Sequence, residues 1–168
     1  MNLLWKRVSD LTITKSLRLQ SGAVLQHEGR SIPAGSIRAV DRTQHNDKVI
    51  LLDTASGSVC TLPAATGSGM AVTFMVSTAL SSNNHVVKVG NTTDVLVGGV
   101  VASGDNITNG VTAFEPVAAD DTLTLNGGTT GGRVGDRVEL YDLKAGFWAI
   151  NGRITEVGAE ATPFSATV

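Results

Sequence analysis

The sequence predicts an all-β fold, and three observations carry this prediction. From residue 37 onward, short segments that alternate apolar and polar residues recur every ten or so positions, separated by glycine, asparagine and serine. Only 17% of the residues are charged, and glycine and β-branched residues are abundant, which suits strands joined by tight turns. No segment shows a convincing 3.6-residue period. We therefore expect a β-sandwich or β-barrel.

The alternation is clearest over residues 122–153, which read as three short strands. The last two strands are joined by Leu143–Gly146, a short loop suited to an antiparallel hairpin. Pairing across this loop predicts two faces. The core face is expected to carry Val138, Leu140, Trp148 and Ile150. The opposite face shows Arg137, Glu139, Tyr141, Phe147 and Asn151. Because Arg and aromatic residues are common at the centre of protein interfaces, Arg137, Tyr141 and Phe147 are candidates for contact with another subunit.

Earlier strands are expected over residues 37–40, 48–52, 58–62, 72–76, 85–89, 94–97 and 112–115. Turn-forming residues separate them, such as Gly67–Gly69 and Asn109–Gly110. No repeat of fixed period is evident. A solenoid or propeller is therefore not expected.

Residues 1–36 differ from the rest and predict an N-terminal arm, followed by a body over residues 37–168. Leu11, Ile13, Leu17 and Leu19 alternate, but Lys15 interrupts them, as in an exposed strand that can pair with another chain. Fully extended, such an arm reaches on the order of 120 Å. The alternative is that these residues form an ordinary first hairpin of the body.

Charge is unevenly distributed along the chain. The net charge of −2 argues against a nucleic-acid-binding surface over the whole protein. Residues 1–48 carry eight Lys and Arg against four acids, a net charge of +4, whereas the remainder carries five against eleven, a net charge of −6. This asymmetry fits docking between copies or onto a lattice, and it also fits a plainly solvated surface.

The single cysteine, Cys60, lies in an alternating run and is expected to be a small core residue. No apolar run approaches the ~20 residues of a membrane span. Residues 1–7 lack the pattern of a signal peptide. We expect synthesis in a cytoplasm and no contact with a membrane.

No arrangement of residues indicates a catalytic, metal-binding or phosphate-binding site. His27, His45 and His85 are scattered, without a second histidine or cysteine at metal-ligand spacing. The glycine-rich run Gly127–Gly132 lacks the lysine and the following helix of a phosphate-binding loop, so it is expected to be a connector. We expect no enzyme, metal or cofactor. The alternative of a hydrolase with a dispersed triad stays open, because triad members can lie far apart in sequence.

Several short segments of this sequence resemble segments of capsid decoration (cement) and head-fibre-like proteins of tailed bacteriophages. In order they are TLPAATG (residues 61–67), VTFMV (72–76), TLTLNGGTTGG (122–132), GDRVEL (135–140) and GFWAING (146–152). The resemblance covers roughly residues 48–153. Similar strands occur in tail and fibre proteins of phages, and a tail or fibre module that binds host surface polysaccharide is therefore the alternative.

The resemblance implies a jelly-roll-like sandwich or barrel that assembles as a homotrimer and binds the major capsid protein on the outer surface of the shell. It implies no catalytic residue, no cofactor and no nucleic-acid partner. The arm would then supply the contacts with the capsid. The candidate residues are Trp5, Lys6, Arg7, Leu11, Ile13, Lys15, Leu17, Arg18 and Leu19.

Overall fold

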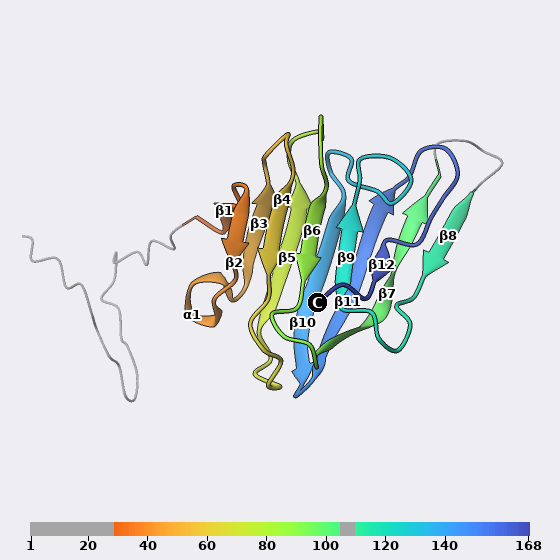
Figure 1. Ribbon diagram of the computed structural model, residues 1–168. Coiled ribbons are helices and arrows are strands. Elements are labelled where there is room, and N and C mark those ends of the chain that lie inside the picture. The colour runs from red at the N-terminus through yellow and green to blue at the C-terminus, as the bar shows by residue number, and fades with distance from the viewer. Residues whose placement is uncertain (1–28, 105–109) are drawn as a thin grey trace, which may run out of the picture.

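The computed structural model describes residues 29–104 and 110–168 (Figure 1). These residues form two mixed β-sheets that pack face to face, with one very short helix at the end where the described chain begins. The fold is nearly all β, as the alternation predicts.

The larger sheet has seven strands and the smaller sheet has five. The larger sheet runs in the order β1 (Ser31–Pro33), β3 (Lys48–Leu52), β5 (Ala71–Val76), β10 (Arg137–Lys144), β11 (Phe147–Thr155), β7 (Val95–Ser103) and β8 (Val111–Phe114). The smaller sheet runs in the order β12 (Phe164–Ser165), β9 (Thr122–Leu125), β6 (His85–Lys88), β4 (Ser58–Thr61) and β2 (Ile37–Ala39). Helix α1 covers Arg42–His45 and is capped by Asp41, whose carboxylate accepts from the N–H groups of Thr43 and Gln44.

The first six strands wind as a parallel coil. They alternate between the two sheets, so that β1, β3 and β5 lie parallel in the larger sheet and β2, β4 and β6 lie parallel in the smaller one. Successive turns differ in length: Ser31 pairs with Val49, 18 residues on, and Val49 pairs with Thr73, 24 residues on. A solenoid-like arrangement was not expected from the sequence. Unequal turns hide it, because no fixed period is left to detect.

The second half of the chain closes the sandwich with antiparallel strands. Strand β10 pairs antiparallel with both β5 and β11, and β11 pairs parallel with β7 over its whole length. The expected jelly-roll-like order is not confirmed, because a jelly roll is built from antiparallel strands, whereas the pairs within β1 to β6 and the pair of β11 with β7 are parallel. A closed barrel is also not formed by the described residues, because each sheet ends in two edge strands.

The core lies between the sheets. Its largest fully buried side chains include Trp148, Phe74, Ile50 and Leu123. The predicted inner face of the last hairpin is confirmed: Val138, Leu140, Trp148 and Ile150 are all buried. Burying each large apolar side chain stabilises the fold by roughly 1.5–3 kcal/mol. The hairpin is thus a main part of the core.

All ten predicted strands are present, and the structure adds β1, β12 and α1. Proline in Ser31–Pro33 and the two-residue length of Phe164–Ser165 explain why no alternation marked these strands. Residues 31–33 of the expected arm pair with β3 in the larger sheet. Residues 1–28 of that arm lie outside the described residues.

Candidate binding face

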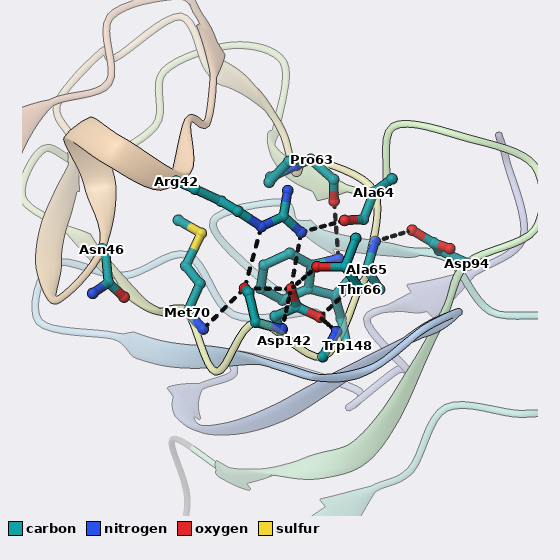
Figure 2. Close-up of polar contacts among 12 residues, drawn as sticks. Arg42, Asn46, Pro63, Ala64, Ala65, Thr66, Met70, Asp94, Asp142 and Trp148 are labelled. Atoms are coloured by element: carbon teal, nitrogen blue, oxygen red, sulfur yellow. Dashed lines mark hydrogen bonds and ion pairs between the residues drawn. The ribbon is translucent and has the colours of Figure 1, made fainter.

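The loop between β4 and β5 is held by one buried carboxylate, that of Asp142 on β10 (Figure 2). Its oxygens accept hydrogen bonds from the backbone N–H groups of Thr66, Gly67 and Ser68 at 2.8–3.1 Å. The hydroxyls of Thr66 and Ser68 and the guanidinium of Arg42 also donate to it, the last at 2.9 Å. Burial alone would raise the pKa of Asp142, but these hydrogen bonds hold it well below its ordinary value.

Three further contacts fix the same loop (Figure 2). The indole N–H of Trp148 donates to the Pro63 carbonyl at 3.1 Å, and the backbone N–H of Ala65 donates to Asp94 at 2.6 Å. Arg42, from helix α1, also donates to the Ala64 carbonyl. Residues 63–68 are therefore bound to the last hairpin, to Asp94 just before β7, and to α1 by polar groups that are mostly buried.

Asp142 was not identified from the sequence as a buried acid, although its position in the strand indicates that it is one. Val138 and Leu140 point inward, and Asp142 is the next position on the same side of the strand. A buried acid is seldom tolerated without partners. Its partners lie some 75 positions away, and no pattern near Asp142 reveals them.

The outer face of the larger sheet is the candidate site for binding another protein. The three predicted subunit-contact residues, Arg137, Tyr141 and Phe147, all lie on it, on β10 and β11. Arg137 is exposed, 46% of Tyr141 is exposed, and Phe147 is half-buried. The structure shows where these residues lie, and their role in an interface stays a prediction.

At the end of this face nearer β8, the surface is hollowed into a groove of about 550 Å³. It is lined by Val101, Ser103, Val111, Arg137, Glu139, Asn151, Gly152 and Arg153. Arg137 pairs directly across the hairpin with Arg153, and its guanidinium binds Glu139 at 2.8 Å. The groove therefore combines two arginines with exposed valines.

At the opposite end of the hairpin, the face becomes more aromatic. The ammonium of Lys144 lies 4.3 Å from the centre of the Phe147 ring, and Tyr141 lies on the same side of β10. Trp148, the third aromatic residue of the hairpin, is fully buried and so does not contribute to this surface.

The predicted capsid-contact residues all lie outside the described residues. They are Trp5, Lys6, Arg7, Leu11, Ile13, Lys15, Leu17, Arg18 and Leu19.

Two of the three histidines are structural in their surroundings, and His27 lies outside the described residues. His45 is buried, and its Nδ1 accepts from the backbone N–H of Asp41. His85 is fully buried opposite Ser58 on β4, and burial lowers its pKa. Among the residues that the structure describes, neither the imidazole of His85 nor the hydroxyl of Ser58 has a hydrogen-bond partner of normal geometry. These two groups form no open catalytic site.

Cys60 is a buried core residue, as predicted, and burial raises the pKa of its thiol to about 12. A thiol that stays protonated is a poor nucleophile and a poor metal ligand.

A second buried carboxylate, that of Glu156 just after β11, is surrounded differently from Asp142. Neither of its oxygens accepts a hydrogen bond from any described residue. Burial and, after it, the nearby charges of Glu160 and Asp136 together raise the pKa of Glu156 to about 7.

Within residues 29–104 and 110–168, no three His, Cys, Asp or Glu side chains are arranged to hold a metal ion. In the same ranges, no helix is long and apolar enough to cross a membrane. Comparison with known proteins finds no matching family model, no matching curated sequence and no matching solved structure.

Proposed function

We propose that this chain is a structural virion protein that binds the outside of a phage capsid and stabilises the shell as a cement protein. The observation that carries the proposal is the resemblance of residues 48–153 to capsid decoration proteins. The segments that carry this resemblance adjoin one another in the fold. Trp148 of GFWAING donates to Pro63 of TLPAATG, and VTFMV pairs with GDRVEL as strands β5 and β10.

The stabilising effect follows from mass action. A protein that binds the assembled shell, and not its separated subunits, stabilises the shell by RT ln(1 + [L]/Kd) at every occupied site. Many sites on one shell multiply this effect. No catalytic residue is needed, and the proposed function includes none.

The proposal assigns different tasks to two parts of the chain. Residues 1–36 bind the major capsid protein, with strand addition by residues 11–19 and with the net positive charge of residues 1–48 assisting. Arg137, Tyr141 and Phe147 contact other copies in a homotrimer. The exposed residues of β10 on the outer face of the seven-stranded sheet, among them Arg137, Glu139 and Tyr141, support an assembly of this kind, since they offer a surface for a protein partner.

The proposal is tested by adding the purified protein to phage heads that lack it. We expect the temperature at which the heads disrupt to rise, and hundreds of copies to bind each head. If the wild-type protein does not bind such heads, the proposed function is wrong. Deleting residues 1–20 should weaken binding while the thermal unfolding of the body stays unchanged.

The alternative, a tail or fibre module for host polysaccharide, relied on exposed aromatic residues. The burial of Trp148 removes one of the three, and Lys144 lies over the ring of Phe147. Immunogold labelling of virions separates the two functions, because a cement protein labels the head and a fibre module labels the tail.

A further inference from the structure

We propose that the groove on the outer face of the larger sheet binds an extended protein segment in which an Asp or Glu is flanked by apolar residues. The inference rests on the proposed function in one respect: it takes this segment to belong to the shell. It deepens that function, because it names the chemistry of the partner and a docking place on the body of the protein. It assigns Arg137, which lines the groove, to this contact with the shell and leaves the homotrimer contact to Tyr141 and Phe147.

The first argument is that two neighbouring arginines share a single ion-pair partner among the described residues. Arg137 and Arg153 lie directly opposite each other on the antiparallel strands β10 and β11, and both are exposed. Like charges in this position destabilise a sheet. Arg137 has Glu139 as its ion-pair partner, whereas the described residues provide no ion pair for Arg153.

A carboxylate from outside would relieve this imbalance. Guanidinium groups bind carboxylates through two parallel N–H···O bonds, and this geometry is specific to Arg. A single Asp or Glu between Arg137 and Arg153 would receive hydrogen bonds from both. Its charge would also offset the repulsion between them.

The second argument is the apolar border of the groove. Val101 lies beside Arg153 on the neighbouring strand β7, and Val111 follows on β8. Val101 is 42% exposed and Val111 is 70% exposed. On the other side of the arginines, Met75 pairs with Arg137 and is half-buried. Apolar side chains on either side of an acidic residue would cover these surfaces.

The third argument is the surface beside Asn151, which is one of the residues that line the groove. Gly99 of β7 lies next to Asn151, and a Cβ at Gly99 would come within 2.7 Å of the Phe114 carbonyl oxygen. A side chain is thus excluded at Gly99, and the surface stays hollow. The exposed amide of Asn151 can both donate to and accept from the backbone of an extended segment.

The size of the face favours a protein over a small molecule. Seven strands spaced by ~4.8 Å span roughly 29 Å, and eight residues of β10 span roughly 27 Å. A small-molecule pocket encloses most of its ligand, and a groove with exposed valines on its rim does not.

The first experiment measures binding to phage heads that lack this protein. Arg153→Glu should weaken binding roughly ten- to a hundred-fold, because charge-assisted hydrogen bonds contribute about 1.5–3 kcal/mol. Arg133→Glu is the matched control. Arg133 is also exposed and undergoes the same change of charge, but it lies in a different hollow with Leu80 and Val134. Equal unfolding temperatures would show that both variants fold.

The second experiment does not depend on the proposed function. A short synthetic peptide of alternating valine and glutamate is titrated into the isotopically labelled protein, and backbone amide shifts are recorded. We expect shifts confined to β7, β10 and β11 near the groove, and their loss in Arg153→Glu. A valine–lysine peptide should cause none. Inorganic phosphate serves as the probe for a general anion site.

The outcomes separate the two proposals. If wild-type protein binds heads and Arg153→Glu binds equally well, the groove is not the docking place and the proposed function stands. If wild-type protein binds no heads, the proposed function fails, and the peptide titration alone decides on the groove. Equal shifts with phosphate would overturn the peptide inference. Dissociation of an oligomer of the purified protein by Arg153→Glu would assign the face to a second copy and overturn it as well.

Discussion

Asp142 and Glu156 are two carboxylates at the same depth in the protein, and they lie in opposite electrostatic surroundings. Both are fully buried, and both belong to the last hairpin or its immediate continuation. Asp142 accepts hydrogen bonds from Thr66, Gly67, Ser68 and Arg42, and its pKa is lowered. Glu156 accepts none from the described residues, and its pKa is raised. Burial alone raises the pKa of either carboxyl group. The hydrogen bonds that each carboxylate accepts then decide whether its pKa ends above or below the ordinary value.

The strongest test of this contrast is Asp142→Ala. We expect a loss of about 3–5 kcal/mol in the free energy of unfolding, because the change leaves N–H groups of residues 66–68 and the Arg42 guanidinium without their acceptor. Denaturant unfolding measures it. Glu139→Ala is the control, since this exposed carboxylate lies in the same strand. An equally small effect for both variants would contradict the structural importance of Asp142.

Trp148→Ala and Trp148→Phe together separate the apolar from the polar contribution of Trp148 to the free energy of unfolding. We expect a loss of about 3–5 kcal/mol, since a fully buried large side chain and the hydrogen bond to Pro63 disappear together. Trp148→Phe keeps most of the apolar volume and should cost less. Near-normal stability of Trp148→Ala in thermal and denaturant unfolding would show that the side chain is not part of the core.

Glu156→Gln should have the opposite sign to Asp142→Ala. Because the folded-state pKa of Glu156 is raised to about 7, the folded protein holds this proton more tightly than the unfolded chain does. The native state therefore loses stability as pH rises from the ordinary glutamate pKa to about 7. Glu156→Gln should stabilise the protein by roughly 1–3 kcal/mol at pH 8 and have little effect at pH 5.

The matched control for this prediction is Glu115→Gln on the surface, which should change stability little at either pH. Asp142 supplies the converse pH dependence. Its lowered pKa makes its contribution complete above the ordinary aspartate pKa and lost as pH falls through the lowered value. If Glu156→Gln changed the free energy of unfolding equally at pH 5 and pH 8, the pKa of Glu156 would not be raised in the folded protein, and this prediction would be wrong.

The smallest expected effect concerns the outer face. Tyr141→Ser should change the unfolding free energy of the isolated protein by no more than about 0.5 kcal/mol, because a surface side chain away from caps and networks contributes little. The same substitution should weaken self-association if the proposed subunit contact is correct. Light scattering measures the second effect, and calorimetry the first. A large loss of stability would place Tyr141 among the residues that hold the fold together.

Local alternation predicted much of this fold, and long-range pairing explains the part that it could not predict. The inward and outward sides of the last hairpin followed from Val138, Leu140 and Trp148, because a strand alternates with a strict period of two. The parallel coil was missed because its turns differ in length. Strand order depends on pairings between distant residues, which no short window contains.

The candidate site was predicted to a similar extent. Arg137, Tyr141 and Phe147 were placed on the outer face from their spacing alone, and they lie there. Arg153 was missed as a groove residue, because the residues assigned to the outer face of the third strand stopped at Asn151, whereas β11 continues to Thr155. The anchoring of the Pro63–Ser68 loop could not be foreseen, since it joins Asp142, Asp94 and α1 across more than half the chain.

The coil of β1 to β6 is built from turns that could be inserted or deleted as whole units. Each turn contributes one strand to each sheet and, within the coil, pairs with the turn before and the turn after it, while β5 and β6 of the last turn also pair with β10 and β9. Inserting or deleting a whole turn would widen or narrow the sandwich by ~4.8 Å in each sheet while leaving the hairpin and its groove intact. Sequences related by such changes could differ in width and in the distance between Gly29 and the groove. They would still present the same docking surface, and this makes the coil a natural place to lengthen the molecule by design.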